Sequence, residues 1–103
     1  TVSNVPAQSL ILMNDPFVIA QAQRWASRVL SEKDALPEQR VREVYLDAFS
    51  RPPTASELTA ALGFLDEQGA KLGIPATERR ANEKVWADLC HVMLNVKEFI
   101  FVN

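Results

Sequence analysis

Apolar side chains recur along this chain at the three- and four-residue spacing of helices that bury one face. The pattern is clearest between Pro16 and Glu32, where Gln21, Arg24 and Arg28 lie opposite the apolar positions. This spacing predicts a helix that packs on one side only. Its expected apolar face consists of Val18, Ala22, Trp25, Ala26, Val29 and Leu30.

The same spacing predicts three more helices, at about residues 37–49, 55–72 and 77–95. We expect each of them to bury one stripe of side chains against the others. The expected stripes are Val41, Val44, Tyr45, Ala48 and Phe49 in the first, Leu58, Ala61, Leu62 and Leu65 in the second, and Val85, Trp86, Leu89, Cys90, Met93 and Val96 in the last.

Capping and breaking residues mark where these helices begin and end. Asp15 can cap a helix that begins at a proline, Leu36-Pro37 opens the next helix, and the stretch Thr54-Ala55-Ser56-Glu57 matches a capping box. The prolines at 52–53 must end a helix, because they lack amide donors and clash with the preceding turn. Leu72-Gly73-Ile74-Pro75 ends another, since glycine adopts the left-handed conformation readily.

Both ends of the chain are expected to be mainly extended. The opening TVSNVP precedes room for a short helix at residues 7–13, and residues 98–102 form an extended tail that carries Phe99 and Phe101. The fold class that follows is all-α: a compact bundle or orthogonal array of four main helices plus one short N-terminal helix, with extended termini. A chain of 103 residues has room for one core, so we expect one domain over residues 1–103.

Composition and charge exclude several classes of protein. The chain is 48% hydrophobic and 23% charged, with a net charge of −2, and its longest apolar run (Leu10 to Met13) is far below the roughly 20 residues that span a bilayer. We therefore expect no membrane insertion and, without a basic stripe, no nucleic-acid partner. Because Thr1 is not a natural start and runs straight into patterned sequence, we expect a fragment of a larger protein whose targeting signal lies upstream.

Cys90 and His91 are adjacent, which raises the possibility of a metal or haem site. A c-type haem needs a second cysteine three residues earlier, where this chain has Ala87. Neighbouring side chains on a helix diverge by about 100°, so one metal cannot easily bind both. We expect Cys90 to be buried and His91 to lie on an exposed polar stripe beside Asp88. No cofactor, metal or catalytic residue is predicted, and the domain is not expected to be an enzyme.

A helix-turn-helix is the sharpest alternative in the middle of the chain. Residues 36–62 contain a helix, a short turn and a second capped helix. The second helix carries Glu57, Asp66 and Glu67 against one Lys71, whereas contact with phosphates requires basic side chains. DNA binding is therefore only a distant alternative.

The ends of the chain allow two interpretations. In the structural one, Asn95 ends the last helix, Glu98 pairs with an arginine such as Arg51, and Phe99 and Phe101 cover the core. In the functional one, the extended terminus adds to another domain or protomer. The candidate docking surface is then Val2, Val5, Phe99 and Phe101, and a weak homodimer through exposed termini is a further expectation.

Three blocks carry a family resemblance: VPAQSLILMNDPFV, YLDAFSRPPTASEL and WADLCHVMLNVKEFIFVN. Together they resemble the C-terminal part of the planctomycete cytochrome-associated domain of unknown function, family fifteen fifty-three, found in large secreted proteins. The matching positions are Pro6, Gln8, Leu10, Asn14, Arg51, Pro52, Pro53, Glu57, Asn95, Glu98 and Phe99.

The resemblance implies an extracytoplasmic multidomain protein in which upstream domains of the same polypeptide are the partners. The leading hypothesis is a non-catalytic structural or docking module that closes the C-terminal end of that protein. In the alternative, the domain lends residues to an enzyme or electron-transfer site assembled with upstream regions. The candidate polar contacts for that site are Arg51, Asp88, His91 and Glu98.

Overall fold

The structure is a computed structural model that describes the backbone of residues 15–102 and the side chains of residues 15–96. Within this range the chain is helical and contains no strand, which confirms the predicted all-α class. The elements are α2 (Pro16–Leu30), α3 (Pro37–Phe49), α4 (Ala55–Lys71), the 3-10 turn η1 (Arg79–Ala81) and α5 (Glu83–Val102). The helix predicted at 7–13, and the residues Val2 and Val5, lie outside the described residues.

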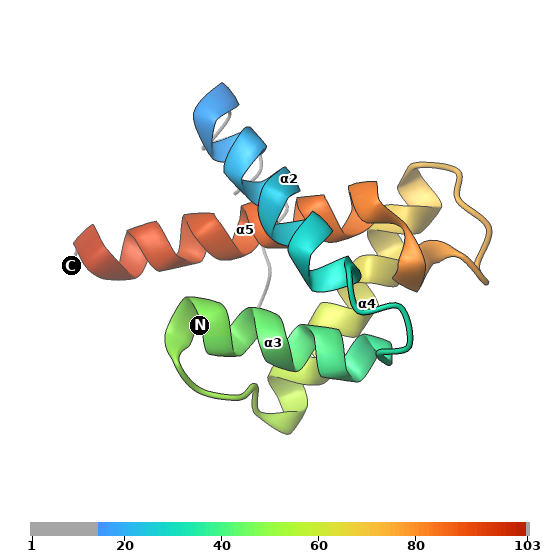
Figure 1. Ribbon diagram of the computed structural model, residues 1–103, viewed down its shortest axis with the longest axis horizontal. Coiled ribbons are helices and arrows are strands. Elements are labelled where there is room, and N and C mark those ends of the chain that lie inside the picture. Colours follow the sequence, from blue (N-terminus) through green and yellow to red (C-terminus); the bar gives the residue numbers. More distant parts are fainter. Residues whose placement is uncertain (1–14, 103) are drawn as a thin grey trace.

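The helices cross one another around α5, the longest of them (Figure 1). Helix α2 crosses α5 steeply and packs along it more extensively than any other pair of elements does. Helices α3 and α4 also contact α5, and they contact each other through a tight corner at residues 50–54. The arrangement is therefore an orthogonal array in which α5 is the shared packing partner.

The predicted starts of α2 and α4 are confirmed by their caps. Asp15 Oδ1 accepts a hydrogen bond of 2.8 Å from the amide of Phe17, which satisfies one donor of the first turn of α2. At α4, Thr54 Oγ1 accepts from the Glu57 amide at 3.2 Å, and Glu57 Oε1 accepts from the Thr54 amide at 2.8 Å. These two bonds form the predicted capping box.

The two predicted helix stops of the central region are also confirmed. Helix α3 ends at Phe49, and Ser50 takes a left-handed conformation (φ 59°) two residues before the first of the two prolines. Gly73 likewise has a positive φ of 75° after α4. A left-handed residue lets the chain leave the helix while the last carbonyls keep hydrogen-bond partners. Here the Ser50 N–H donates a hydrogen bond to the Leu46 carbonyl.

Both boundaries predicted for the last helix are wrong. It begins at Glu83 rather than Thr77, because residues 79–81 form the separate turn η1 and the Asn82 side chain accepts from the Val85 amide at 3.1 Å. It also runs to Val102 instead of ending at Asn95. The alternating Phe99 and Phe101 resembled a strand, but a helix satisfies its own backbone groups, whereas the described residues offer no strand for pairing.

One core joins all four helices, and most of the predicted apolar stripes point into it. Trp86, Leu65 and Leu89 are its largest fully buried side chains, and the Trp86 indole donates a 2.8 Å hydrogen bond to the Arg80 carbonyl. The pattern missed Phe64, which is buried, and placed Leu58 and Leu62 deeper than they lie. The buried apolar residues are Ala22, Trp25, Ala26, Val29, Val41, Val44, Tyr45, Ala61, Phe64, Leu65, Val85, Trp86, Ala87, Leu89, Cys90, Val92 and Met93.

Candidate functional site

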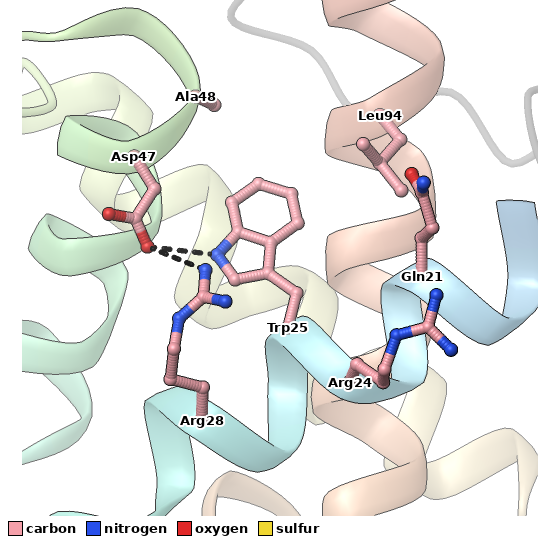
Figure 2. Close-up of a pocket in the computed structure, with 7 residues that line it drawn as sticks. All are labelled: Gln21, Arg24, Trp25, Arg28, Asp47, Ala48 and Leu94. Carbon is pink, nitrogen blue, oxygen red and sulfur yellow. Dashed lines mark hydrogen bonds and ion pairs between the residues drawn. The ribbon is translucent and has the colours of Figure 1, made fainter.

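A groove of about 300 Å³ opens where α2, α3 and α5 meet (Figure 2). Helix α2 provides most of its lining, α3 provides one acidic and one small side chain, and α5 provides one leucine. The lining residues are Gln21, Arg24, Trp25, Arg28, Asp47, Ala48 and Leu94.

The indole of Trp25 forms the floor of this groove and is held in place by α3. Its Nε1–H donates a 3.0 Å hydrogen bond to Asp47 Oδ2, which joins α2 to α3 across 22 residues of sequence. The ring is only 8% exposed and stands between Asp47 and Leu94 in Figure 2. Only a small part of Trp25 thus borders the groove, in a fixed orientation and next to the small side chain of Ala48.

The charges around the floor are unevenly paired. The same Asp47 oxygen that accepts from Trp25 lies 3.6 Å from Arg28 Nη2, which is beyond the usual length of a charge-assisted hydrogen bond. The Arg28 side chain is 66% exposed, so this ion pair contributes little. Arg24 forms no ion pair with any side chain of residues 15–96. Two arginines therefore face one carboxylate, and the lining carries an excess positive charge.

A second groove, of about 260 Å³, lies between α2, α4 and α5 and brings together two of the predicted polar contacts, Asp88 and His91. Asp88 is 6% exposed; its Oδ1 accepts from Lys84 Nζ at 2.7 Å and its Oδ2 from Gln68 Nε2 at 2.9 Å. The prediction that His91 is exposed is wrong, because α2 and α4 cover this face of α5 and leave the side chain 8% exposed.

Arg51, the third predicted polar contact, belongs to a different cluster. Its guanidinium donates to both Glu57 oxygens, at 2.8 and 2.9 Å, and stands over the rings of Tyr45 and Phe49 at 5.8 Å from each centroid. Glu57 is thus the carboxylate observed on Arg51, and the predicted pairing of Glu98 with an arginine stays a prediction. The side chains of Glu98, Phe99 and Phe101 lie outside those that the structure describes.

The electrostatics of this cluster favour a fixed ion pair. Hydrogen bonds from Arg51, aided by the Thr54 amide, lower the pKa of Glu57 to about 2, although burial opposes the shift. Burial, and then the charge of Glu57, raise the pKa of Tyr45 to about 12. These groups stay in one charge state across the physiological range, which suits a structural joint between α3 and α4 better than proton transfer.

Cys90 is fully buried, as predicted, and burial raises the pKa of its thiol to about 12. It therefore packs as a small hydrophobic side chain. In the part of the chain that the structure describes, no group of three or more His, Cys, Asp or Glu side chains is arranged to hold a metal ion. Likewise, none of the described helices combines the length and apolar character needed to cross a membrane.

Sequence reasoning placed Arg24 and Arg28 on the outer face of their helix and Trp25 in the core, and did not connect them with Asp47. Helical spacing defines the faces of one helix, but it does not tell which side chains of a second helix oppose them. The only local signal for this groove was a tryptophan between two arginines. The same pattern is expected of a tryptophan that is buried in the core while the neighbouring arginines face solvent.

The fold defines an all-α domain with an open groove between its helices. A family model described as PSD1, protein of unknown function (DUF1553), matches residues 1–65. This match covers more than half of the 103 residues, and the chain belongs to that family. The first two blocks of the resemblance fall within the matched residues, and the third lies beyond them. Comparisons with curated proteins and with solved structures found no match.

Proposed function

We propose that this domain is a non-catalytic helical module that docks onto the upstream part of a larger extracytoplasmic protein. The setting comes from the resemblance to the C-terminal part of the planctomycete, cytochrome-associated domain in large secreted proteins. The docking role is supported by the groove between α2, α3 and α5. In this proposal the groove receives a segment of the upstream polypeptide and closes the C-terminal end of the assembly.

The single observation behind this function is the fixed aromatic floor of an open groove. Aromatic and arginine side chains are enriched in the centres of protein interfaces, where a rigid ring offers a large contact area at low entropic cost. Trp25 is largely buried, but its exposed part borders the groove, and the bond to Asp47 sets its orientation before any partner arrives. Arg24 and Arg28 flank it on the open side. This combination suits recognition of a partner segment.

Isolated apolar side chains elsewhere on the surface support docking less well. Phe17, Leu36, Leu46 and Leu72 are exposed, and Phe17 reaches 65%. They belong to α2, the loop before α3, α3 itself and the end of α4. Scattered exposed hydrophobic residues are normal on monomeric proteins, so these positions do not define an interface.

Calorimetry tests the proposal. The upstream region of the parent polypeptide is expressed separately and titrated with this domain, and with a Trp25→Ala variant whose helical content is checked by circular dichroism. We expect saturable binding that Trp25→Ala weakens by about tenfold or more, in the range of an aromatic interface residue. The matched control is Phe17→Ala, which removes an exposed ring outside the groove. This variant should bind the upstream region as tightly as the unmodified domain does. Absence of binding by the unmodified domain would contradict the docking role.

One observation favours a second candidate, in which the domain lends residues to an enzyme or electron-transfer site shared with upstream regions. Asp88 and His91 lie together on the wall of the second groove, one turn apart on α5. A buried carboxylate close to a histidine is a common arrangement for orienting the imidazole. Full-length protein carrying His91→Gln tests this: loss of activity with an unchanged unfolding temperature supports it, and unchanged activity opposes it.

A further inference from the structure

We infer that the groove between α2, α3 and α5 binds an acidic segment of a protein, in which carboxylate side chains flank an aliphatic one. This inference rests on the docking role and names the chemistry of the partner. Charge, the shape of the floor and the position of the arginines each contribute to it.

The charge of the groove is opposite to that of the domain as a whole. The chain has a net charge of −2, whereas the lining contains Arg24 and Arg28 against Asp47 alone. Asp47 is already engaged, because one of its oxygens accepts from the Trp25 indole and lies near Arg28. Incoming carboxylates therefore find two guanidinium groups with unused donors, and an arginine has five. Complementary charge of this kind determines orientation and specificity more than affinity.

The two arginines lie on different sides of the Trp25 ring. Both are on α2 and one turn apart, yet Figure 2 shows Arg28 on the α3 side of Trp25 and Arg24 on the α5 side, near Gln21. A segment that crosses the ring with a carboxylate on either side would use both.

The groove also has a smaller apolar part in a lining that is more polar than apolar. The Trp25 ring, Ala48 and Leu94 form the part of the lining that an aliphatic side chain can cover. Burial of apolar surface contributes roughly 25 cal/mol per Å², so a leucine or isoleucine at this point would add affinity that charge alone does not supply. The combination favours an amphipathic acidic peptide over a purely charged ligand.

Nucleic acid fits this groove poorly. Phosphate backbones bind to extended tracks of basic side chains and release counterions in proportion to their number. Here Asp47 occupies the wall, and the neighbouring face of α3 carries Glu43 in addition. A short single-stranded oligonucleotide therefore serves as the competing probe in the test.

The test uses fluorescence anisotropy of labelled peptides at low ionic strength. The probe is a short peptide in which glutamates flank a pair of leucines, and its counterparts carry lysines in place of glutamates or serines in place of leucines. We expect the acidic amphipathic peptide to bind, both counterparts to bind at least about tenfold more weakly, and salt to reduce the affinity. Equal binding of the acidic and basic peptides, no binding of the acidic one, or tighter binding of the oligonucleotide would overturn the inference.

Charge reversal locates the site. The double variant Arg24→Glu and Arg28→Glu should lose roughly tenfold or more in affinity for the acidic peptide, because each exposed attraction is replaced by a repulsion. Neither side chain is buried, but Arg28→Glu places a second carboxylate near Asp47, so the fold of the variant is checked by circular dichroism and by its unfolding temperature. Arg42→Glu is the matched control, since it reverses an exposed arginine on α3 outside the groove. Equal losses in the double variant and the control would overturn the assignment to this groove.

The same variants separate this inference from the docking role when the upstream region is the titrant. Binding of the upstream region that is weakened by Trp25→Ala but not by the double charge reversal would keep docking and reject an acidic partner. In the opposite case, the upstream region does not bind but the domain still binds the acidic peptide selectively. This result would reject the upstream region as the partner and keep the inference that the groove binds acidic segments.

Discussion

Arg51 and Glu57 are joined by two parallel hydrogen bonds across the corner between α3 and α4, with Nη1–Oε1 and Nη2–Oε2 distances of 2.8 and 2.9 Å. The same carboxylate closes the capping box by accepting from the Thr54 amide. The Glu57 side chain therefore satisfies the Thr54 amide at the start of α4. It also connects α4 to Arg51, which follows the left-handed Ser50. Because Glu57 is buried while Arg51 remains half-exposed, the carboxylate is the member of the pair that needs its partner more.

Replacing Glu57 by Gln should lower the stability of the domain. The amide keeps the shape of the side chain and can still accept from the Thr54 amide, but its NH2 group would face a donor of Arg51, and a buried group that loses its partner costs about 1 to 3 kcal/mol. Urea unfolding followed by circular dichroism measures the change. Glu67→Gln on the exposed face of α4 is the control and should stay within about 0.5 kcal/mol of the parent domain.

The domain should lose stability in acid through the same group. The pKa of Glu57 is lowered from 4.5 to about 2 in the folded state, so its contribution is fully present above pH 4.5 and is lost as the pH falls towards 2. Unfolding temperatures measured between pH 6 and pH 2 should fall across this window. The fall should be shallower in Glu57→Gln, which has no proton to bind at this position. Parallel curves for the two proteins would show that other carboxylates cause the acid sensitivity.

Two glycines of α4 should respond oppositely to alanine. A Cβ on Gly69 would approach Cβ of Arg79 to 2.8 Å and its Cγ more closely still, where the chain returns over α4. These atoms are close to the backbone and cannot swing away freely, so Gly69→Ala should destabilise by about 1 to 3 kcal/mol. Gly63 has nothing within 4 Å of its Cβ position, and Gly63→Ala should stabilise by up to about 1 kcal/mol. Thermal unfolding of the two variants checks both signs.

The thiol of Cys90 should be unreactive in the folded domain. It is fully buried, and burial raises its pKa to about 12, so that little thiolate forms and none is accessible. The rate of reaction with an aromatic disulfide reagent should be at least roughly a hundredfold slower in buffer than in denaturant, since labelling must await opening of the core. Rapid labelling under native conditions would show that α5 is less firmly packed than described.

Local signals explain most of what could be predicted from the sequence. Helix starts and stops depend on residues that are close together in the sequence. The structure confirms the starts at Asp15-Pro16 and at the Thr54–Glu57 box, and the stop at Gly73. Both ends of the last helix were predicted wrongly, each because a local signal was misread. Asn82 was not recognised as a cap, and the alternation at Phe99 and Phe101 was taken for a strand although no break separates it from the helix.

Contacts between helices were much harder to predict. His91 was placed on a solvated stripe because its own helix offers polar neighbours, yet α2 and α4 cover that stripe. Trp25 was correctly placed in the core, but its bond to Asp47 depends on how α3 lies against α2. The candidate groove arises from such relations between elements, whereas the pattern of one helix reports only its own faces.

The most direct measurement is nuclear magnetic resonance of the labelled domain during titration with the upstream region. The two indole N–H signals form an internal pair, because Trp25 lies in the groove and Trp86 is fully buried on a bond to the Arg80 carbonyl. We predict that the Trp25 signal shifts with saturation, together with the amides of Gln21 and Ala48, while the Trp86 signal stays in place. Binding that leaves the Trp25 signal unmoved, or no binding at all, would contradict docking through this groove.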